Sequence, residues 1–110
     1  MGQYCIDFTL QAREHLNGIY KYIKNELSAP IAARRIVTLI KEEITSLKTS
    51  PERIQLVSEE PWFSLGVRRD RVKNYYIYFI VDNVNKIVHV ADIIYARRDQ
   101  ARQLKELDIK

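Results

Sequence analysis

The sequence contains few of the residue types that form common functional sites. It has one cysteine, three glycines, three prolines and two histidines in 110 residues. A lone Cys5 cannot form an internal disulfide, which indicates a reducing compartment. The glycines, at positions 2, 18 and 66, are isolated, so the chain has no glycine-rich phosphate loop. Because His15 and His89 lack cysteine or carboxylate partners at metal-ligand spacing, we expect no metal and no cofactor.

Long apolar runs are absent too. No segment approaches the length that a helix needs to cross a bilayer, and the N-terminus lacks the charged and apolar regions of a signal peptide. We therefore expect a cytoplasmic protein with no membrane contact. Eighteen basic and fourteen acidic residues give a formal net charge of +4, which suits an acidic partner without requiring one.

The composition that is present is that of a folded domain. Hydrophobic residues make up 46% of the chain and charged residues 29%. These values are typical of globular proteins and not of disordered ones. A chain of 110 residues is near the commonest domain size and is long enough for one hydrophobic core. We expect residues 1–110 to form a single domain.

Two apolar segments, Tyr75–Val81 and Ile87–Tyr95, form the most regular stretch of the chain. Both are rich in β-branched and aromatic residues, as strands covered on both faces are. The residues between them, Asp82–Lys86, have the composition of a hairpin loop. We predict that the two segments are antiparallel neighbours in the middle of a sheet.

The first half of the chain predicts a strand followed by two helices. Gln3–Phe8 alternates apolar and polar residues, which is typical of a half-buried strand near a sheet edge. Thr9 is a suitable N-cap for a helix that runs to about Glu26. Pro30 suits the first turn of a second helix, which we expect to end at Ser50. Apolar residues at helical spacing and a short connection predict an antiparallel helical hairpin.

The remaining segments are less regular. Pro51–Ser64 contains two prolines and predicts a surface loop, in which Trp62 and Phe63 anchor the chain to the core. Three C-terminal strands follow, and Asp99–Leu107 predicts a short polar helix. The order of elements predicts an α+β fold, in which a small antiparallel sheet packs against an antiparallel helical hairpin and a short C-terminal helix closes the chain.

Arginines flank the predicted strand pair on both sides. Arg68, Arg69 and Arg71 precede it, and Arg97 and Arg98 follow it. Because antiparallel neighbours bring the start of one strand beside the end of the next, we expect these five guanidinium groups at one end of the sheet. With tyrosines beside them they suit phosphate binding and base stacking in RNA or single-stranded nucleic acid. Strand tyrosines are also common in cores, and arginines at strand ends commonly form a solvated rim.

A set of short segments stands in a distinctive order along the whole chain. These segments are Ile19–Ile23, Pro51–Arg53, Val67–Arg69, Val72, Asn74–Phe79, Val81–Asp82 and Ile94–Asp99. The ordered set resembles the RelE/ParE superfamily of bacterial toxins from type II toxin–antitoxin modules. The resemblance implies a RelE/ParE-like fold, a role in plasmid stabilisation and growth inhibition, and a cognate antitoxin that neutralises the toxin. It implies one of two targets, the ribosome with its mRNA or DNA gyrase.

The resemblance assigns different residues to the two targets. A RelE-like, ribosome-dependent mRNA endonuclease would use Arg97 and Arg69 as phosphate-stabilising groups, with Tyr95 as a candidate proton shuttle. Tyr76, however, stands where the nuclease branch has a mid-strand arginine, and residues 99–110 contain no tyrosine. The long helical hairpin is more similar to the ParE branch.

We therefore predict ParE-like inhibition of DNA gyrase, which requires a binding surface and no enzymatic site. The predicted target contacts are Arg68, Arg69, Arg71, Arg97 and Arg98. The alternatives are RelE-like mRNA cleavage, with Arg69, Tyr95 and Arg97 as catalytic residues, and a degenerate member that only binds its antitoxin.

Overall fold

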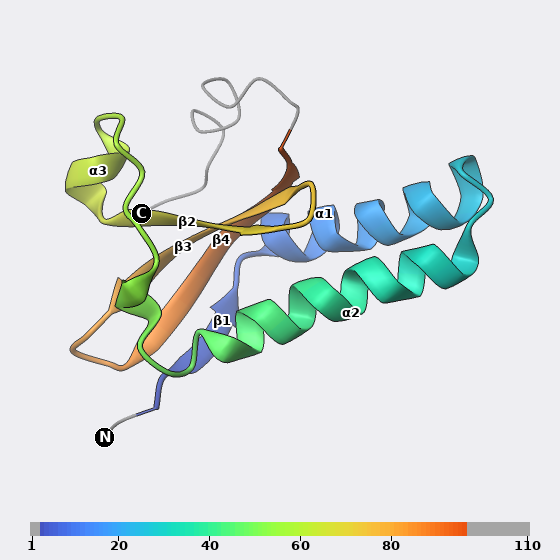
Figure 1. Cartoon of the computed structure of the whole chain (residues 1–110). Coiled ribbons are helices and arrows are strands. Elements are labelled where there is room, and N and C mark those ends of the chain that lie inside the picture. Colours follow the sequence, from blue (N-terminus) through green and yellow to red (C-terminus); the bar gives the residue numbers. More distant parts are fainter. Residues whose placement is uncertain (1–2, 97–110) are drawn as a thin grey trace.

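A four-stranded sheet with two long helices packed on one face makes up the computed structural model, which describes residues 3–96 (Figure 1). The strands are β1 (Cys5–Phe8), β2 (Val67–Val72), β3 (Tyr75–Asp82) and β4 (Ile87–Tyr95). The helices are α1 (Leu10–Lys21), α2 (Pro30–Ser46) and the short α3 (Trp62–Leu65). This arrangement confirms the predicted α+β fold. The C-terminal helix predicted at Asp99–Leu107 lies outside the described residues.

The strand order, β1-β4-β3-β2, confirms that the two apolar segments are antiparallel central neighbours. The sheet is mostly antiparallel, with one exception: β1 pairs with β4 in parallel, from Cys5 opposite Ile87 to Phe8 opposite Val90. β1 is an edge strand, as its alternating sequence predicts. Tyr4 is buried, Ile6 is half-buried and Cys5 is exposed. The edge position explains why only one face of this strand is apolar.

The two long helices begin as predicted. The Thr9 side chain accepts a hydrogen bond from the Ala12 N–H at 3.0 Å, and Pro30 occupies the first turn of α2. The expected end of α2 at Ser50 is wrong, because α2 ends at Ser46. Beyond it the chain tightens into a turn that buries Leu47, before Ser50 adopts a left-handed conformation in front of the proline.

Hydrophobic side chains gather on both faces of β3 and β4. The larger cluster lies between the helices and the sheet; its buried members are Tyr4, Ala12, Ile40, Ile44, Leu47, Ile77, Phe79, Val88, Val90 and Ile93. Each large side chain buried here stabilises the fold by roughly 1.5–3 kcal/mol. The smaller cluster lies on the opposite face and consists of Val57, Val67, Tyr78 and Ile94, with Trp62, Tyr76 and Ile80 packed against it.

The segment Pro51–Ser64 is a loop with a single 3-10 turn at Pro51–Arg53, followed by the start of α3. Trp62 packs on the smaller cluster, which confirms its role as an anchor. Phe63 does not share this role, because its side chain is 49% exposed. Adjacent residues of a helix point in different directions, and only the tryptophan faces the sheet. None of the helices within residues 3–96 is long and apolar enough to span a membrane.

A pair of acidic side chains joins α2 to β2. The Glu43 carboxyl group shares a hydrogen bond with Asp70, which together with partial burial raises the pKa of Glu43 from 4.5 to about 7. Repulsion from Asp70 acts in the same direction, and the nearby Arg53 opposes it. Asp70 Oδ2 is buried and accepts no hydrogen bond from an N–H or hydroxyl group of residues 3–96. A protonated Glu43 therefore satisfies this contact.

We predict that stability falls as pH rises from about 4.5 to about 7. In this window the folded protein holds a proton on Glu43 that the unfolded chain has lost, so the unfolded state is favoured as pH increases. Glu43→Gln, which keeps a donor for Asp70, should be more stable than wild type at pH 8 and lack this part of the decline. Urea unfolding at pH 5 and pH 8 measures both, with Glu42→Gln on the same helix as the control. A decline of wild-type size in Glu43→Gln would contradict the prediction.

Candidate functional site

Strand β2 places its arginines on two different faces of the sheet. Arg69 and Arg71 lie on the face away from the long helices, where their guanidinium carbons are 4.7 and 5.6 Å from the centre of the Tyr76 ring. Arg68 and Asp70 alternate with them and lie on the helix side. The helix-free face therefore carries a basic–aromatic patch, which we define as Arg69, Arg71 and Tyr76.

This basic–aromatic patch is held by the ring at its centre. Attraction between a guanidinium group and an aromatic face is worth about 0.5–1 kcal/mol at exposed sites. The Tyr76 ring in turn meets the edge of the Tyr78 ring, with 6.2 Å between the ring centres. The contacts order Arg69 and Arg71 on one side of the sheet, where they can meet a phosphate or a carboxylate.

Tyr78, beneath the basic–aromatic patch, is completely buried. Burial raises the pKa of Tyr78 above its ordinary value of 10, and the adjacent Arg69 opposes this shift. Its hydroxyl group has no hydrogen-bond partner within residues 3–96. A phenol with a raised pKa is a poor proton acceptor at neutral pH, so Tyr78 supplies no general base to the patch.

Arg68 does not join the other arginines, and the expectation of one cluster at the end of the sheet is wrong for this residue. Its guanidinium group donates to the carbonyl oxygens of Glu52 and Ile54 at 3.1 and 2.6 Å. The Glu52 carboxylate lies 3.9 Å away. Strand alternation turns Arg68 toward the loop that follows α2, where it fixes that loop to the sheet. Arg97 and Arg98 lie outside the described residues.

Tyr95 lies on the helix side of the sheet, opposite to Arg69. Its ring centre is 5.5 Å from that of Tyr75. Burial raises the pKa of Tyr75, and the neighbouring Tyr95 and Tyr22 contribute in the same direction. The two residues expected to act together in RNA cleavage, Arg69 and Tyr95, are thus separated by the thickness of the sheet.

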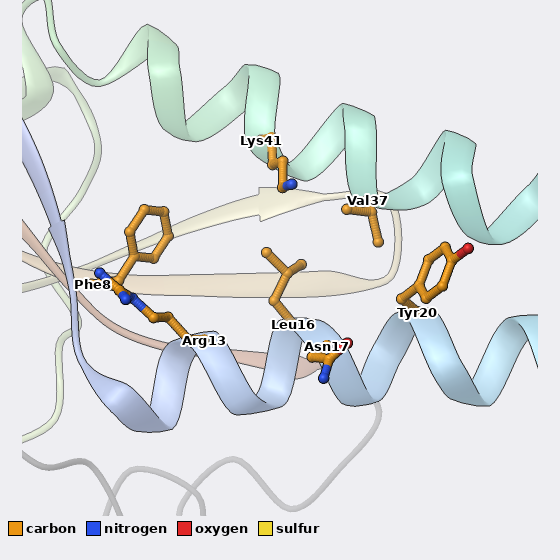
Figure 2. A pocket seen from close by; sticks show the side chains of 7 residues that line it. All are labelled: Phe8, Arg13, Leu16, Asn17, Tyr20, Val37 and Lys41. Carbon is orange, nitrogen blue, oxygen red and sulfur yellow. The ribbon is translucent and has the colours of Figure 1, made fainter.

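Two hollows border the helical hairpin. The outer pocket, of about 580 Å³, lies between α1 and α2 (Figure 2). Its lining is Phe8, Arg13, Leu16, Asn17, Tyr20, Val37 and Lys41. Figure 2 shows Leu16 and Val37 pointing toward each other from the two helices. The inner groove, of about 800 Å³, lies between α1 and the ends of β3 and β4, with Tyr22, Leu27, Lys73, Tyr75 and Tyr95 among its lining residues.

Comparison with models of known protein families identifies the family of this chain. The family model described as "ParE toxin of type II toxin-antitoxin system, parDE" matches residues 6–100. The chain belongs to the ParE toxin family. No curated protein matches the sequence.

Solved structures share the fold of this ParE-family toxin at low sequence identity. The chromosomal ParDE system from P. aeruginosa has a chain with a TM-score of 0.71 and 22% identity, and the match covers 86% of this chain and 98% of that chain. The M. tuberculosis RelBE2 complex gives a TM-score of 0.65 and 21% identity, covering 86% and 93%. A mutant of the E. coli toxin RelE in the free state gives 0.64 and 14%, covering 96% and 98%. Both branches of the superfamily therefore share this architecture.

The ParE-family toxin contains one polar cluster that the sequence interpretation missed. Asp92, in the apolar strand β4, is completely buried. Its Oδ1 lies 2.6 Å from His15 Nδ1, and its Oδ2 accepts a hydrogen bond from Gln11 at 2.6 Å. The sequence feature that could have indicated this cluster is Asp92 itself, because a carboxyl group in an otherwise apolar strand needs a buried partner. No group of three or more potential metal ligands occurs within residues 3–96.

We predict that His15→Ala lowers the free energy of unfolding by about 1–3 kcal/mol, because it removes a partner from a buried carboxyl group. The matched control is His89→Ala. His89 Nδ1 lies 3.4 Å from Asp7, and both side chains are partly exposed. Such surface pairs contribute about 0–1 kcal/mol. Urea unfolding measures both variants, and equal losses would show that the Asp92 contact has no special weight.

Proposed function

We propose that this ParE-family toxin arrests growth by binding and poisoning DNA gyrase in the cytoplasm, as a single toxin domain. The observation that carries the proposal is the separation of Arg69 from Tyr95 by the sheet. A nuclease needs its charge-stabilising and proton-transferring groups around one phosphate. A gyrase poison needs only complementary surface, so the separation does not impair it.

The basic–aromatic patch gives further support. Tyr76 stands at the position where RelE-like nucleases are expected to have a mid-strand arginine, and here its ring supports Arg69 and Arg71. The phenol beneath it, Tyr78, is disfavoured as a base because burial raises its pKa. The patch thus has cations for an acidic surface without a matching proton acceptor among its own residues. Arg97 and Arg98 remain predicted target contacts, whereas the Arg68 guanidinium group is occupied by the carbonyl oxygens of Glu52 and Ile54.

A cognate antitoxin encoded beside this toxin is the second proposed partner. The outer pocket offers an apolar floor, Leu16 and Val37, with Arg13 and Lys41 in its lining and no acidic residue. An amphipathic segment with carboxylates beside its apolar face would satisfy both features. The P. aeruginosa ParDE and M. tuberculosis RelBE2 structures are toxin–antitoxin systems by their descriptions, which supports such a partner here.

RNA cleavage on the ribosome is the alternative, and the basic–aromatic patch is what favours it. Arginines beside a partly exposed ring suit a single-stranded nucleic acid, because the ring stacks on bases while guanidinium groups bind phosphates. The similarity to the RelE structure agrees with this alternative at the level of the fold.

Parallel assays distinguish the two functions. The purified toxin is added to gyrase with relaxed plasmid and to translating ribosomes that carry a defined message. We predict that supercoiling falls, or that cleaved plasmid accumulates, while the message stays intact. If the message is cut only on the ribosome, and if Arg69→Ala reduces cutting by about 10²–10³-fold, the nuclease alternative is correct. If neither target is affected and expression does not arrest growth, the chain is a degenerate member.

A further inference from the structure

The connection between α1 and α2 and the first turn of α2 together expose three large apolar side chains. Tyr22, Leu27 and Ile31 are 56%, 56% and 67% exposed. Figure 1 shows this end of the helical hairpin projecting beyond the sheet, and Tyr22 and Leu27 also line the inner groove beside the ends of β3 and β4. Exposed apolar side chains that gather at one place commonly mark an interaction site.

The same segment of the chain is rich in cations. Residues 21–35 contain Lys21, Lys24, Arg34 and Arg35 against one acidic residue, Glu26, which gives this short segment a net charge of +3. All four cationic residues are exposed. None of the ion pairs within residues 3–96 involves them. The charges are therefore available to an external partner. We name residues 21–35 the hairpin tip.

The backbone of the hairpin tip departs from a regular helix. Tyr22–Glu26 forms a π-helical turn, in which the Leu27 N–H donates to the Tyr22 carbonyl at 3.3 Å. Ser28 follows in the left-handed region, with φ of 49°. Both features are uncommon for these residue types and occur preferentially at functional sites. The wide turn buries Ile23 while Tyr22 and Leu27 face outward.

The chemistry of the hairpin tip selects one kind of partner. Cations alone would suit the phosphate backbone of a nucleic acid. Phosphate groups, however, make no favourable apolar contact with three aliphatic or aromatic side chains. A protein surface with an apolar centre and an acidic rim satisfies both. We propose that the hairpin tip docks the toxin onto such a surface of its target protein, with Tyr22, Leu27 and Ile31 at the centre of the contact. This inference rests on the proposed function. It assigns the target protein to the hairpin tip, whereas the antitoxin is assigned to the outer pocket.

The test compares two double variants of the full chain. Leu27→Ser with Ile31→Ser removes the apolar centre of the hairpin tip. Leu10→Ser with Val84→Ser removes two apolar side chains that are 72% and 91% exposed elsewhere. Since all four side chains are exposed, both variants should unfold at the wild-type temperature. We call the Leu27→Ser, Ile31→Ser protein the tip variant. We expect that equal inhibition of gyrase requires about 10–30-fold more of the tip variant than of wild type, because hot-spot residues typically carry losses of this size. Expression of the tip variant should also no longer arrest growth. The control should match wild type.

Binding to the protein encoded beside the toxin gene gives the second measurement, and we expect the tip variant to retain it fully. Undiminished growth arrest in the tip variant would overturn the inference. The inference would also be overturned if the tip variant kept its binding to the target protein and instead lost binding to the antitoxin, self-association of the toxin, or binding to a duplex DNA probe. If wild type arrests growth without affecting gyrase, the proposed target is wrong, and relief of arrest by the tip variant still supports the docking surface.

Discussion

The burial of β3 and β4 from both sides is the constraint on which this structure depends. Phe79 packs beneath the long helices and Tyr78 packs on the smaller cluster, and neither side chain is exposed. Because the sheet is stabilised at its centre, its edges and the helical hairpin can carry polar and charged residues without loss of the core. Binding features accordingly lie at the periphery, on β2, in the outer pocket and at the hairpin tip.

The sheet also separates the candidate functional residues, because they lie on its two opposite faces. Side chains that are neighbours in sequence point to opposite faces, so Arg68 binds the loop after α2 while Arg69 lies over the half-buried ring of Tyr76. The same alternation directs Tyr95 toward the helices. An active site that combines residues from both faces is therefore not available within the described strands. A toxin that acts through binding surfaces is compatible with this division.

The sequence predicted the central strand pair, the edge strand and the helical hairpin, because their periodicity and capping residues act locally. The placement of Arg68 could also have been predicted by applying strand alternation to β2. The contact between His15 and Asp92 could not, since these residues are 77 positions apart. It depends on how α1 crosses β4, near a bulge between Tyr78 and Phe79 in the strand pairing. The hairpin tip was missed because a π-helical turn has no clear sequence signature.

Amide hydrogen exchange of the toxin, alone and bound to gyrase, tests the central claim most directly. The claim is that the hairpin tip is part of the surface through which the toxin binds its target protein. Protection on binding should appear in residues 21–35. Unchanged exchange in residues 21–35 when gyrase is bound would contradict the account.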